Sequence, residues 1–173
     1  MQIFLLAFFG FIGLWPTVQQ PSNWVEFKSL DGGFEAAMPA PPQTNTLAIQ
    51  TSDGTLFTHI VSSNDHGVDE YMVSWTDYPA KSVEQRATEK TFGRMRDALI
   101  RHKEGKLLTE TAASKEGYPA RTITFSTKDR FVTVMFCFVK NRSYQLVVET
   151  KTDDARAVDR FFSSFRFLPA EPL

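Results

Sequence analysis

The sequence lacks the residues from which disulfides and multi-thiolate metal sites are built, because it contains a single cysteine, Cys137. One cysteine excludes an intrachain disulfide and any zinc site that needs several thiolates. Cys137 lies in the middle of an apolar stretch. We therefore expect a buried and unreactive thiol at this position, not a nucleophile.

The chain also lacks an excess of charge of either sign. Nineteen basic residues stand against twenty acidic ones, which gives a formal net charge of −1. General nucleic-acid binding needs a net basic surface that releases counterions, so this balance argues against a nucleic-acid partner. Tyrosine is scarce as well: four Tyr stand beside sixteen Phe. The aromatic residues are therefore expected to serve mostly in packing.

The amino-terminal segment carries no charged side chain before Glu26, and Ile3–Trp15 is continuously apolar apart from its glycines. Such a run predicts that residues 1–20 are a signal peptide or an N-terminal hydrophobic anchor. As a helix of ~1.5 Å per residue the run would reach roughly 20 Å, less than the ~30 Å of a bilayer core. We therefore expect an exported protein, periplasmic or extracellular. Anchoring by an uncleaved leader, a membrane tether, is the alternative.

Residues 24–168 are predicted to form one domain that alternates strands and turns. Turn residues punctuate it at Asp31-Gly32-Gly33, Ser52-Asp53-Gly54 and Glu116–Pro119. A polar loop is expected at Asn64–Glu70. The predicted strands are Trp24–Lys28, Phe34–Met38, Thr46–Thr51, Thr55–Ser62, Tyr71–Tyr78, Leu107–Ala113, Ala120–Ser126, Arg130–Val139 and Tyr144–Thr150.

The last quarter of the chain fixes the architecture. Arg130–Val139 is apolar at both alternating sets of positions, which is typical of a central strand covered on both faces. A tight Asn141-Arg142 link joins it to the next strand. Asp153–Phe165 then has its apolar residues at helical spacing, with acidic residues at the amino-terminal end.

A longer helix is predicted from Ser82 to His102. Ser82 and Gln85 form a capping box, and Gly105 is the expected stop. The apolar stripe of this helix consists of Val83, Ala87, Met95, Ala98 and Leu99. Together the elements predict an α+β fold, with a largely antiparallel β-sheet flanked by helices in an α/β/α sandwich.

Several short motifs resemble those of a family of small exported bacterial domains. They are Trp24…Phe27, Gly33-Phe34…Met38-Pro39, Trp75–Pro79, Gly117–Arg121, Asn141–Tyr144 and Phe161…Ser164-Phe165-Arg166. These domains are similar in layout to the fold shared by PsbP, an extrinsic photosystem protein, and a nuclear Ran-binding factor. The resemblance covers about Trp24 to Phe167. It implies a PsbP-like fold and a binding or assembly role, while its turn and packing residues carry little functional information.

One candidate site is the run Ser62–His66, which contains every residue type of a hydrolase triad. Adjacent residues cannot adopt triad geometry, because triad members converge from separate parts of a fold. No G-x-S-x-G motif is present either. No catalytic residue is assigned, and no cofactor-binding residue or cofactor is predicted.

A second candidate is the acidic loop, with Asp65, His66, Asp69 and Glu70 as metal candidates and Asp77 on the next strand. Oxygen ligands on such a loop suit Ca²⁺ or Mn²⁺. The loop lacks the residue order of a dedicated calcium loop, and polar loops are acidic by default. A solvated acidic turn is the competing interpretation.

Two further features have structural explanations. His59 shares a predicted strand face with Phe57 and Val61, which favours a histidine packed against the core over a ligand. Basic residues recur on the long helix, which could meet an anionic surface. They are interspersed with acidic ones, which is typical of a solvated face. They are Arg86, Lys90, Arg94, Arg101 and Lys103.

The sequence thus favours an exported, non-catalytic domain that binds an envelope protein or a small ligand. The alternative is a metal-dependent hydrolase-type enzyme that uses the acidic loop 65–77 with His59. Convergence of these side chains in a concave pocket would favour the enzyme.

Overall fold

The structure is a computed structural model that describes residues 24–51, 54–65, 67, 69–79 and 89–169. The predicted leader at residues 1–20 and the capping box at Ser82 and Gln85 lie outside the described residues. None of the described helices is long and apolar enough to cross a membrane.

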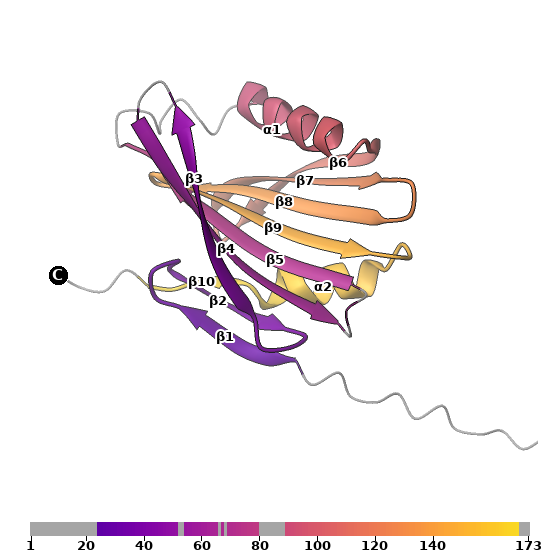
Figure 1. The fold of residues 1–173 in the computed structure, drawn as a ribbon, viewed down its shortest axis with the longest axis horizontal. Coiled ribbons are helices and arrows are strands. Elements are labelled where there is room, and N and C mark those ends of the chain that lie inside the picture. Colours follow the sequence, from indigo (N-terminus) through magenta and orange to yellow (C-terminus); the bar gives the residue numbers. More distant parts are fainter. Residues whose placement is uncertain (1–23, 52–53, 66, 68, 80–88, 170–173) are drawn as a thin grey trace, which may run out of the picture.

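Most of the described chain belongs to two antiparallel sheets (Figure 1). A seven-stranded sheet has the order β3-β4-β5-β9-β8-β7-β6, and a three-stranded sheet has the order β1-β2-β10. The elements are β1 (Val25–Ser29), β2 (Phe34–Met38), β3 (Gln43–Thr51), β4 (Gly54–Asp65), β5 (Asp69–Asp77), α1 (Glu89–His102), β6 (Lys106–Lys115), β7 (Tyr118–Ser126), β8 (Phe131–Val139), β9 (Arg142–Thr150), α2 (Ala155–Ser164) and β10 (Arg166–Phe167).

Helix α1 covers one face of the seven-stranded sheet, over β7 and β8. Phe92 is the buried residue of this helix, and Met95 and Leu99 pack beside it. Below them lies an apolar layer from the sheet, whose buried members are Ile123, Phe125, Val132, Val134, Phe136 and Phe138. The four alternate residues of β8 that the sequence places on one side of a central strand all lie in this layer.

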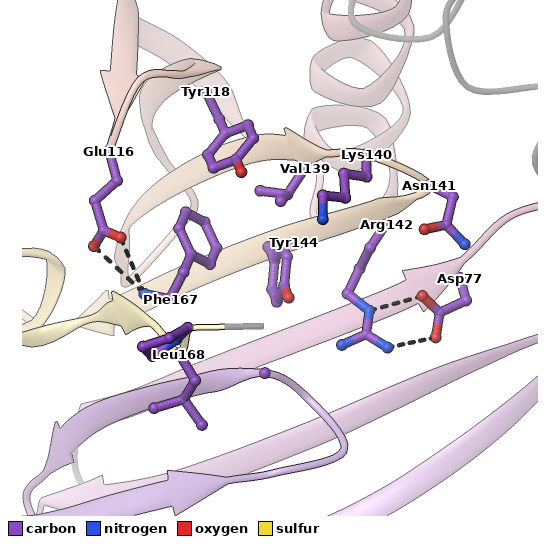
Figure 2. Close-up of a pocket in the computed structure, with 12 residues that line it drawn as sticks. Asp77, Glu116, Tyr118, Val139, Lys140, Asn141, Arg142, Tyr144, Phe167 and Leu168 are labelled. Atoms are coloured by element: carbon purple, nitrogen blue, oxygen red, sulfur yellow. Dashed lines mark hydrogen bonds and ion pairs between the residues drawn. The ribbon is translucent and has the colours of Figure 1, made fainter. Parts of the chain in front are cut away.

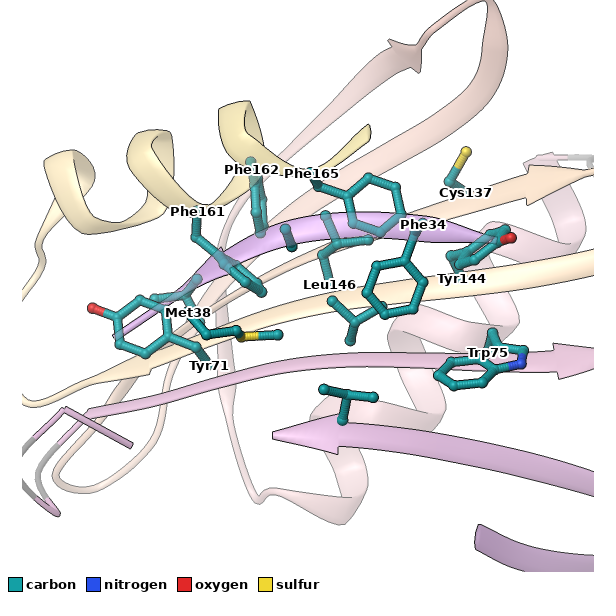
Figure 3. Packing of buried hydrophobic residues seen from close by; sticks show 14 of the residues in the cluster. Phe34, Met38, Tyr71, Trp75, Cys137, Tyr144, Leu146, Phe161, Phe162 and Phe165 are labelled. Atoms are coloured by element: carbon teal, nitrogen blue, oxygen red, sulfur yellow. The ribbon is translucent and has the colours of Figure 1, made fainter. Parts of the chain in front are cut away.

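The opposite face is covered by the three-stranded sheet together with α2, as Figure 3 shows for the packed side chains. From α2 and its end come Phe161, Phe162 and Phe165, which are buried against Phe34 and Leu146. Cys137, on the second face of β8, has no exposed surface. Strand β8 is therefore covered on both faces, as its sequence predicts.

Helix α2 forms because its ends are satisfied locally. The Asp154 carboxylate accepts hydrogen bonds from the main-chain N–H groups of Arg156 and Ala157, both at 3.1 Å, which is an N-cap. Phe165 has extended backbone geometry and ends the helix. Arg166 and Phe167 then pair with Glu35 and Phe34 as β10.

The α+β sandwich is confirmed, and several local predictions are wrong. Four residues of the loop expected at Asn64–Glu70 are strand residues, because Asn64 pairs with Glu70 and Asp65 pairs with Asp69. Ala98 of α1 is exposed, because the face of the helix that packs on the sheet carries Phe92, Met95 and Leu99. The connection between β8 and β9 is Lys140-Asn141, with Val139 opposite Arg142. The sequence predicts the strands β1 and β2, but neither β10 nor the separation of these strands into a second sheet.

Candidate functional site

An open cleft of about 750 Å³ lies at one end of the seven-stranded sheet (Figure 2). Turns and strand ends that are distant in the sequence form it. Its lining residues are Gly33, Asp77, Glu116, Tyr118, Val139, Lys140, Asn141, Arg142, Tyr144, Phe167, Leu168 and Pro169. In an antiparallel sheet successive turns alternate between its two ends, so the β6–β7 and β8–β9 turns lie at the same end, next to the end of β5.

Arg142 holds three elements together on one side of the cleft. Its guanidinium donates two hydrogen bonds of 2.7 Å to the carboxylate of Asp77, at the end of β5. A third hydrogen bond, of 2.8 Å, goes to the main-chain oxygen of Asp31 in the β1–β2 turn. The hydrogen bonds to Asp77 raise the pKa of the Arg142 guanidinium above its ordinary value. The bidentate pair with Asp77 holds the guanidinium in place, and the bond to Asp31 fixes the β1–β2 turn against the edge of the cleft.

Aromatic rings form the floor of the cleft. Tyr144 is buried, and its hydroxyl donates a hydrogen bond of 2.8 Å to the main-chain oxygen of Gly32. Burial raises the pKa of the Tyr144 hydroxyl, so this group stays protonated. The half-buried ring of Phe167 lies 5.1 Å from that of Tyr144 and 5.6 Å from that of Tyr118, centroid to centroid. The floor thus combines an edge-to-face contact, Tyr118 with Phe167, and a tilted contact, Tyr144 with Phe167.

Two charged side chains at the rim, Glu116 and Lys140, differ in whether they are bonded to the rest of the protein. The carboxylate of Glu116 accepts hydrogen bonds from the main-chain N–H of Phe167, at 3.3 and 3.4 Å. Lys140 lies at the tip of the β8–β9 turn with φ of 51° and is exposed. Its ammonium group has no ion-pair partner among the described residues. Lys140 is therefore a cation at the rim of the cleft without an ion pair within the described part of the chain, whereas the guanidinium of Arg142 is paired with Asp77.

The predicted metal candidates lie at the opposite end of the sheet, where the β4–β5 hairpin turns. Asp65 and Asp69 share one face of the sheet and line a second cleft of about 310 Å³, with Trp24, Tyr71, Asp154, Arg156, Ala157 and Arg160. Glu70, the next residue along β5, points to the other face and is exposed. His66 lies outside the described residues.

The acidic residues near this second cleft have protein partners. Asp69 accepts a hydrogen bond of 3.2 Å from the main-chain N–H of Lys151 and lies 4.0 Å from the guanidinium of Arg130. Burial, followed by the charges of Asp69 and Asp65, raises the pKa of Tyr71 to about 12. Across the part of the chain that the structure describes, no three His, Cys, Asp or Glu side chains are grouped as metal ligands.

His59 does not join the acidic residues. Its ring stacks on Trp75 with centroids 5.0 Å apart, and its Nδ1 is 3.0 Å from the hydroxyl oxygen of Thr46. Along β4, Asp65 is six residues away, which is about 20 Å of strand. Asp77 lies at the far end of β5 and pairs with Arg142. The described members of the hydrolase set do not converge.

The triad-like run has a structural explanation at Ser63. This serine is buried, and its hydroxyl accepts a hydrogen bond of 3.0 Å from the main-chain N–H of Ala40 and donates one of 2.8 Å to the oxygen of the same residue. It fixes the segment that leads into β3. A hydroxyl held by two main-chain bonds is not placed as a nucleophile.

The basic side chains of α1 are mostly structural or solvated. Arg96 is turned toward the sheet and pairs with Glu110, which also binds Arg121. Lys103 pairs with Glu149 at 2.8 Å. Other members of the predicted stripe, Lys90, Arg94 and Arg101, are exposed, and Arg86 lies outside the described residues. The helix therefore presents a mixed surface.

The cleft residues were present in the sequence only as turn motifs. The segments Gly117–Arg121 and Asn141–Tyr144 carry the family resemblance, and both line the cleft or flank its lining residues. The available signal was topological: in an antiparallel meander the β6–β7 and β8–β9 turns lie at the same end of the sheet. Local composition pointed instead to the acidic hairpin.

Comparison with known proteins shows the fold. No family model matches the sequence, and no curated protein is significantly similar to it. Among solved structures, the chain is similar to the solution structure of cyanobacterial PsbP (CyanoP) from Synechocystis sp. PCC 6803. The TM-score is 0.57 with 13% sequence identity, and the match covers 90% of this chain and 98% of that one. The chain therefore has a PsbP-like α+β fold.

Proposed function

We propose that this protein is an exported, non-catalytic binding domain of the cell envelope, and that its partner docks in the cleft formed by Tyr118, Lys140, Tyr144 and Phe167. The apolar, uncharged start of the sequence supports export. The PsbP-like fold supports a binding or assembly role, by analogy with what the resemblance implies.

The observation that carries this proposal is the state of the two carboxylates in the cleft. Both oxygens of Asp77 accept from Arg142, and Glu116 accepts from the main-chain N–H of Phe167. A general acid or base must exchange a proton with a bound substrate, so groups committed to structural bonds are poorly suited to that role. The cleft offers instead an aromatic floor and an ammonium group, which are binding features.

The chemistry of the cleft describes its ligand. The half-buried rings of Tyr118 and Phe167 favour an apolar group, and the exposed Lys140 favours a carboxylate or another anionic group beside it. An envelope protein that inserts such a segment fits these features, and so does a small ligand that combines an apolar group with an acidic one. In either case the negative charge of the bound partner or ligand would lie beside Lys140 in the β8–β9 turn.

The test is affinity capture from the native cell envelope, with the full-length protein as bait. Lys140→Glu should abolish capture of the partner, because it reverses the charge at the rim. Lys128→Glu is the matched control, since Lys128 is also an exposed lysine in a hairpin turn but lies at the other end of β8. For a small ligand, the same variants are compared by native mass spectrometry of the protein recovered from cells.

Loss of the bound species with Lys140→Glu and its retention with Lys128→Glu supports the proposal. Equal retention by both variants would contradict it. Metal-dependent hydrolysis of model esters by the purified protein, abolished by Asp69→Asn, would favour the enzymatic alternative instead.

A further inference from the structure

The two edge strands of the seven-stranded sheet differ in how they are protected. Strand β6 begins and ends with lysine, at Lys106 and Lys115, and carries Glu110 in an ion pair with Arg121. Its pairing with β7 shifts register between Leu107 and Thr109, a bulge. Charges and bulges are the devices by which proteins prevent an edge strand from pairing with another chain.

Strand β3 has none of these devices. All nine of its residues are exposed, and Gln43–Thr51 contains no charged residue and no proline. Its pairing with β4 is continuous, without a bulge. Half of the main-chain N–H and C=O groups of such an edge point away from the sheet, where a further strand can pair. On β3 the main-chain N–H of Thr46 donates a hydrogen bond of 2.8 Å to the side-chain oxygen of the exposed Asn45, which a strand added at this edge would replace. Leu47 and Ile49 are 48% and 47% exposed on this strand.

The β3–β4 hairpin also extends beyond the rest of the sheet. Pairing between β4 and β5 ends at Thr58 and Thr76, whereas β3 and β4 pair as far as Thr51 and Gly54. Within the described residues, this last part is a two-stranded ribbon, and Phe57 on it is 53% exposed. A two-stranded ribbon alone is marginally stable in water, so an added strand would stabilise it.

The polarity of β3 is symmetric about Ala48. Leu47 and Ile49 flank this residue, Thr46 and Gln50 follow outward, and Asn45 and Thr51 come next. If two copies pair antiparallel about a two-fold axis at Ala48, each apolar residue lies opposite an apolar one and each polar residue opposite a polar one. An isologous interface requires this self-complementarity, and the absence of charge removes like-charge opposition.

We propose that the β3 edge is a dimer interface, at which a second copy of this chain adds its own β3 and makes the two seven-stranded sheets continuous. On one face, Leu47 of each copy packs against Ile49 of the other. On the other face, the two Ala48 side chains leave space that the Phe57 rings of both copies can cover, since Phe57 lies beside Ala48 in the β3–β4 pairing. The interface is separate from the strand-end cleft.

Cysteine cross-linking of the full-length protein in intact cells tests this register. Cα atoms directly opposite in an antiparallel pair are about 4.5–5.5 Å apart, within the ~4.4–6.8 Å range of disulfides. Ala48→Cys should therefore give a disulfide-linked dimer with mild oxidant. Thr46→Cys should not form this disulfide. In the proposed register residue 46 lies opposite residue 50 of the other copy, so the two cysteines would be four residues apart along the strand, about 14 Å. The native Cys137 is buried and does not interfere.

Ala112→Cys is the matched control, an exposed alanine on the protected edge β6, and should stay monomeric. Ala48→Lys should abolish dimers in sedimentation of the detergent-solubilised protein, because two lysines would face each other, whereas Ala112→Lys should leave sedimentation unchanged. Monomeric Ala48→Cys, or equal cross-linking through residues 46 or 112, would overturn the proposal. An Ala48→Cys adduct with a different protein would overturn it too, since the occupant would then not be a second copy.

Discussion

The two faces of the seven-stranded sheet are covered in different ways. The α1 face is closed by Phe92, Met95 and Leu99 over an apolar layer whose buried members are all Phe, Ile and Val. The other face lies beneath a helix and a second sheet, and its buried layer includes Cys137, Tyr71 and Tyr144. The strand-end cleft opens beside this second layer. One face is simply covered by a helix, whereas the elements that cover the other face also form part of the cleft.

Hydrogen bonds hold α2, β10 and the three-stranded sheet together, and one of them connects this covering layer to β6 of the seven-stranded sheet. Ser164 of α2 accepts a hydrogen bond of 3.0 Å from the main-chain N–H of Ala37, and the ammonium of Lys115 donates one of 2.9 Å to the main-chain oxygen of Phe162. The main-chain N–H of Leu168 donates a hydrogen bond of 2.9 Å to the main-chain oxygen of Gly33. These bonds fix the orientation of the cover, which apolar packing alone leaves adjustable. The cleft thus depends on this layer for its shape.

The largest expected effect is that of deleting residues 153–173, which removes α2 and β10. Deletion leaves Phe34, Val73 and Leu146 without their cover and removes β10, one of the two strands that pair with β2. An exposed apolar surface of this size leads to aggregation. We expect an insoluble or strongly dye-binding protein. A monomeric truncated protein that unfolds cooperatively would show that the second layer is peripheral.

A matched pair of phenylalanine substitutions compares the two covers directly. Phe161, with no exposed surface, contacts the rings of Trp24, Tyr71 and Phe162. Phe161→Ala should lower the free energy of unfolding by about 4–5 kcal/mol, the upper part of the usual range for this change. Phe92→Ala should cost about 3 kcal/mol, because α1 can settle onto the sheet. Urea unfolding measures both, and a larger loss with Phe92→Ala would contradict the comparison.

Much of this architecture could be predicted from the sequence. Strand β8 is apolar on both faces, and the apolar residues of α2 follow helical spacing, so both elements have strong local patterns. Strand β10 has only Arg166 and Phe167, which pair with residues about 130 positions earlier in the chain, and two residues carry no periodicity. The three-stranded sheet therefore could not be predicted.

The cleft was missed for a related reason. Its residues come from separate turns, and none of those turns resembles a known site. The acidic hairpin was selected because Asp65, Asp69 and Glu70 are close in sequence. Strand alternation places Glu70 on the opposite face from the two aspartates. Local composition does not report which face a side chain occupies unless the register is known.

A smaller effect is expected at the thiol of Cys137, which lies on the face of β8 that α2 and the three-stranded sheet cover. Cys137 has no exposed surface, and burial raises its pKa to about 12. It should remain unlabelled by a thiol reagent in native buffer and react fully in denaturant. Cys137→Ser should lower the free energy of unfolding by about 1–3 kcal/mol, since the hydroxyl would be buried in an apolar site. Rapid labelling of the native protein would place this face of β8 in contact with solvent.

The smallest effect is a loss of stability in alkali that originates in the second layer. The pKa values of Tyr71 and Cys137 are each raised to about 12 by burial, from 10.0 and 9.0 respectively. The unfolded chain therefore releases these protons first, so stability is full below about pH 9 and falls as the pH rises toward 12. Urea midpoints measured from pH 8 to 11 should decline less steeply for Tyr71→Phe than for the wild type. An unchanged slope would contradict the assignment to this layer.

Site-specific photo-cross-linking in cells most directly tests the claim that the strand-end cleft is the binding site. A photoreactive residue is placed at Asn141, which lines the cleft, or at Asn64, an exposed asparagine at the opposite end of the sheet. The full-length protein is irradiated in intact cells and its adducts are weighed by mass spectrometry. The account predicts a discrete adduct, protein or small molecule, at position 141 and none at position 64. An adduct at position 64 with none at position 141 would contradict it.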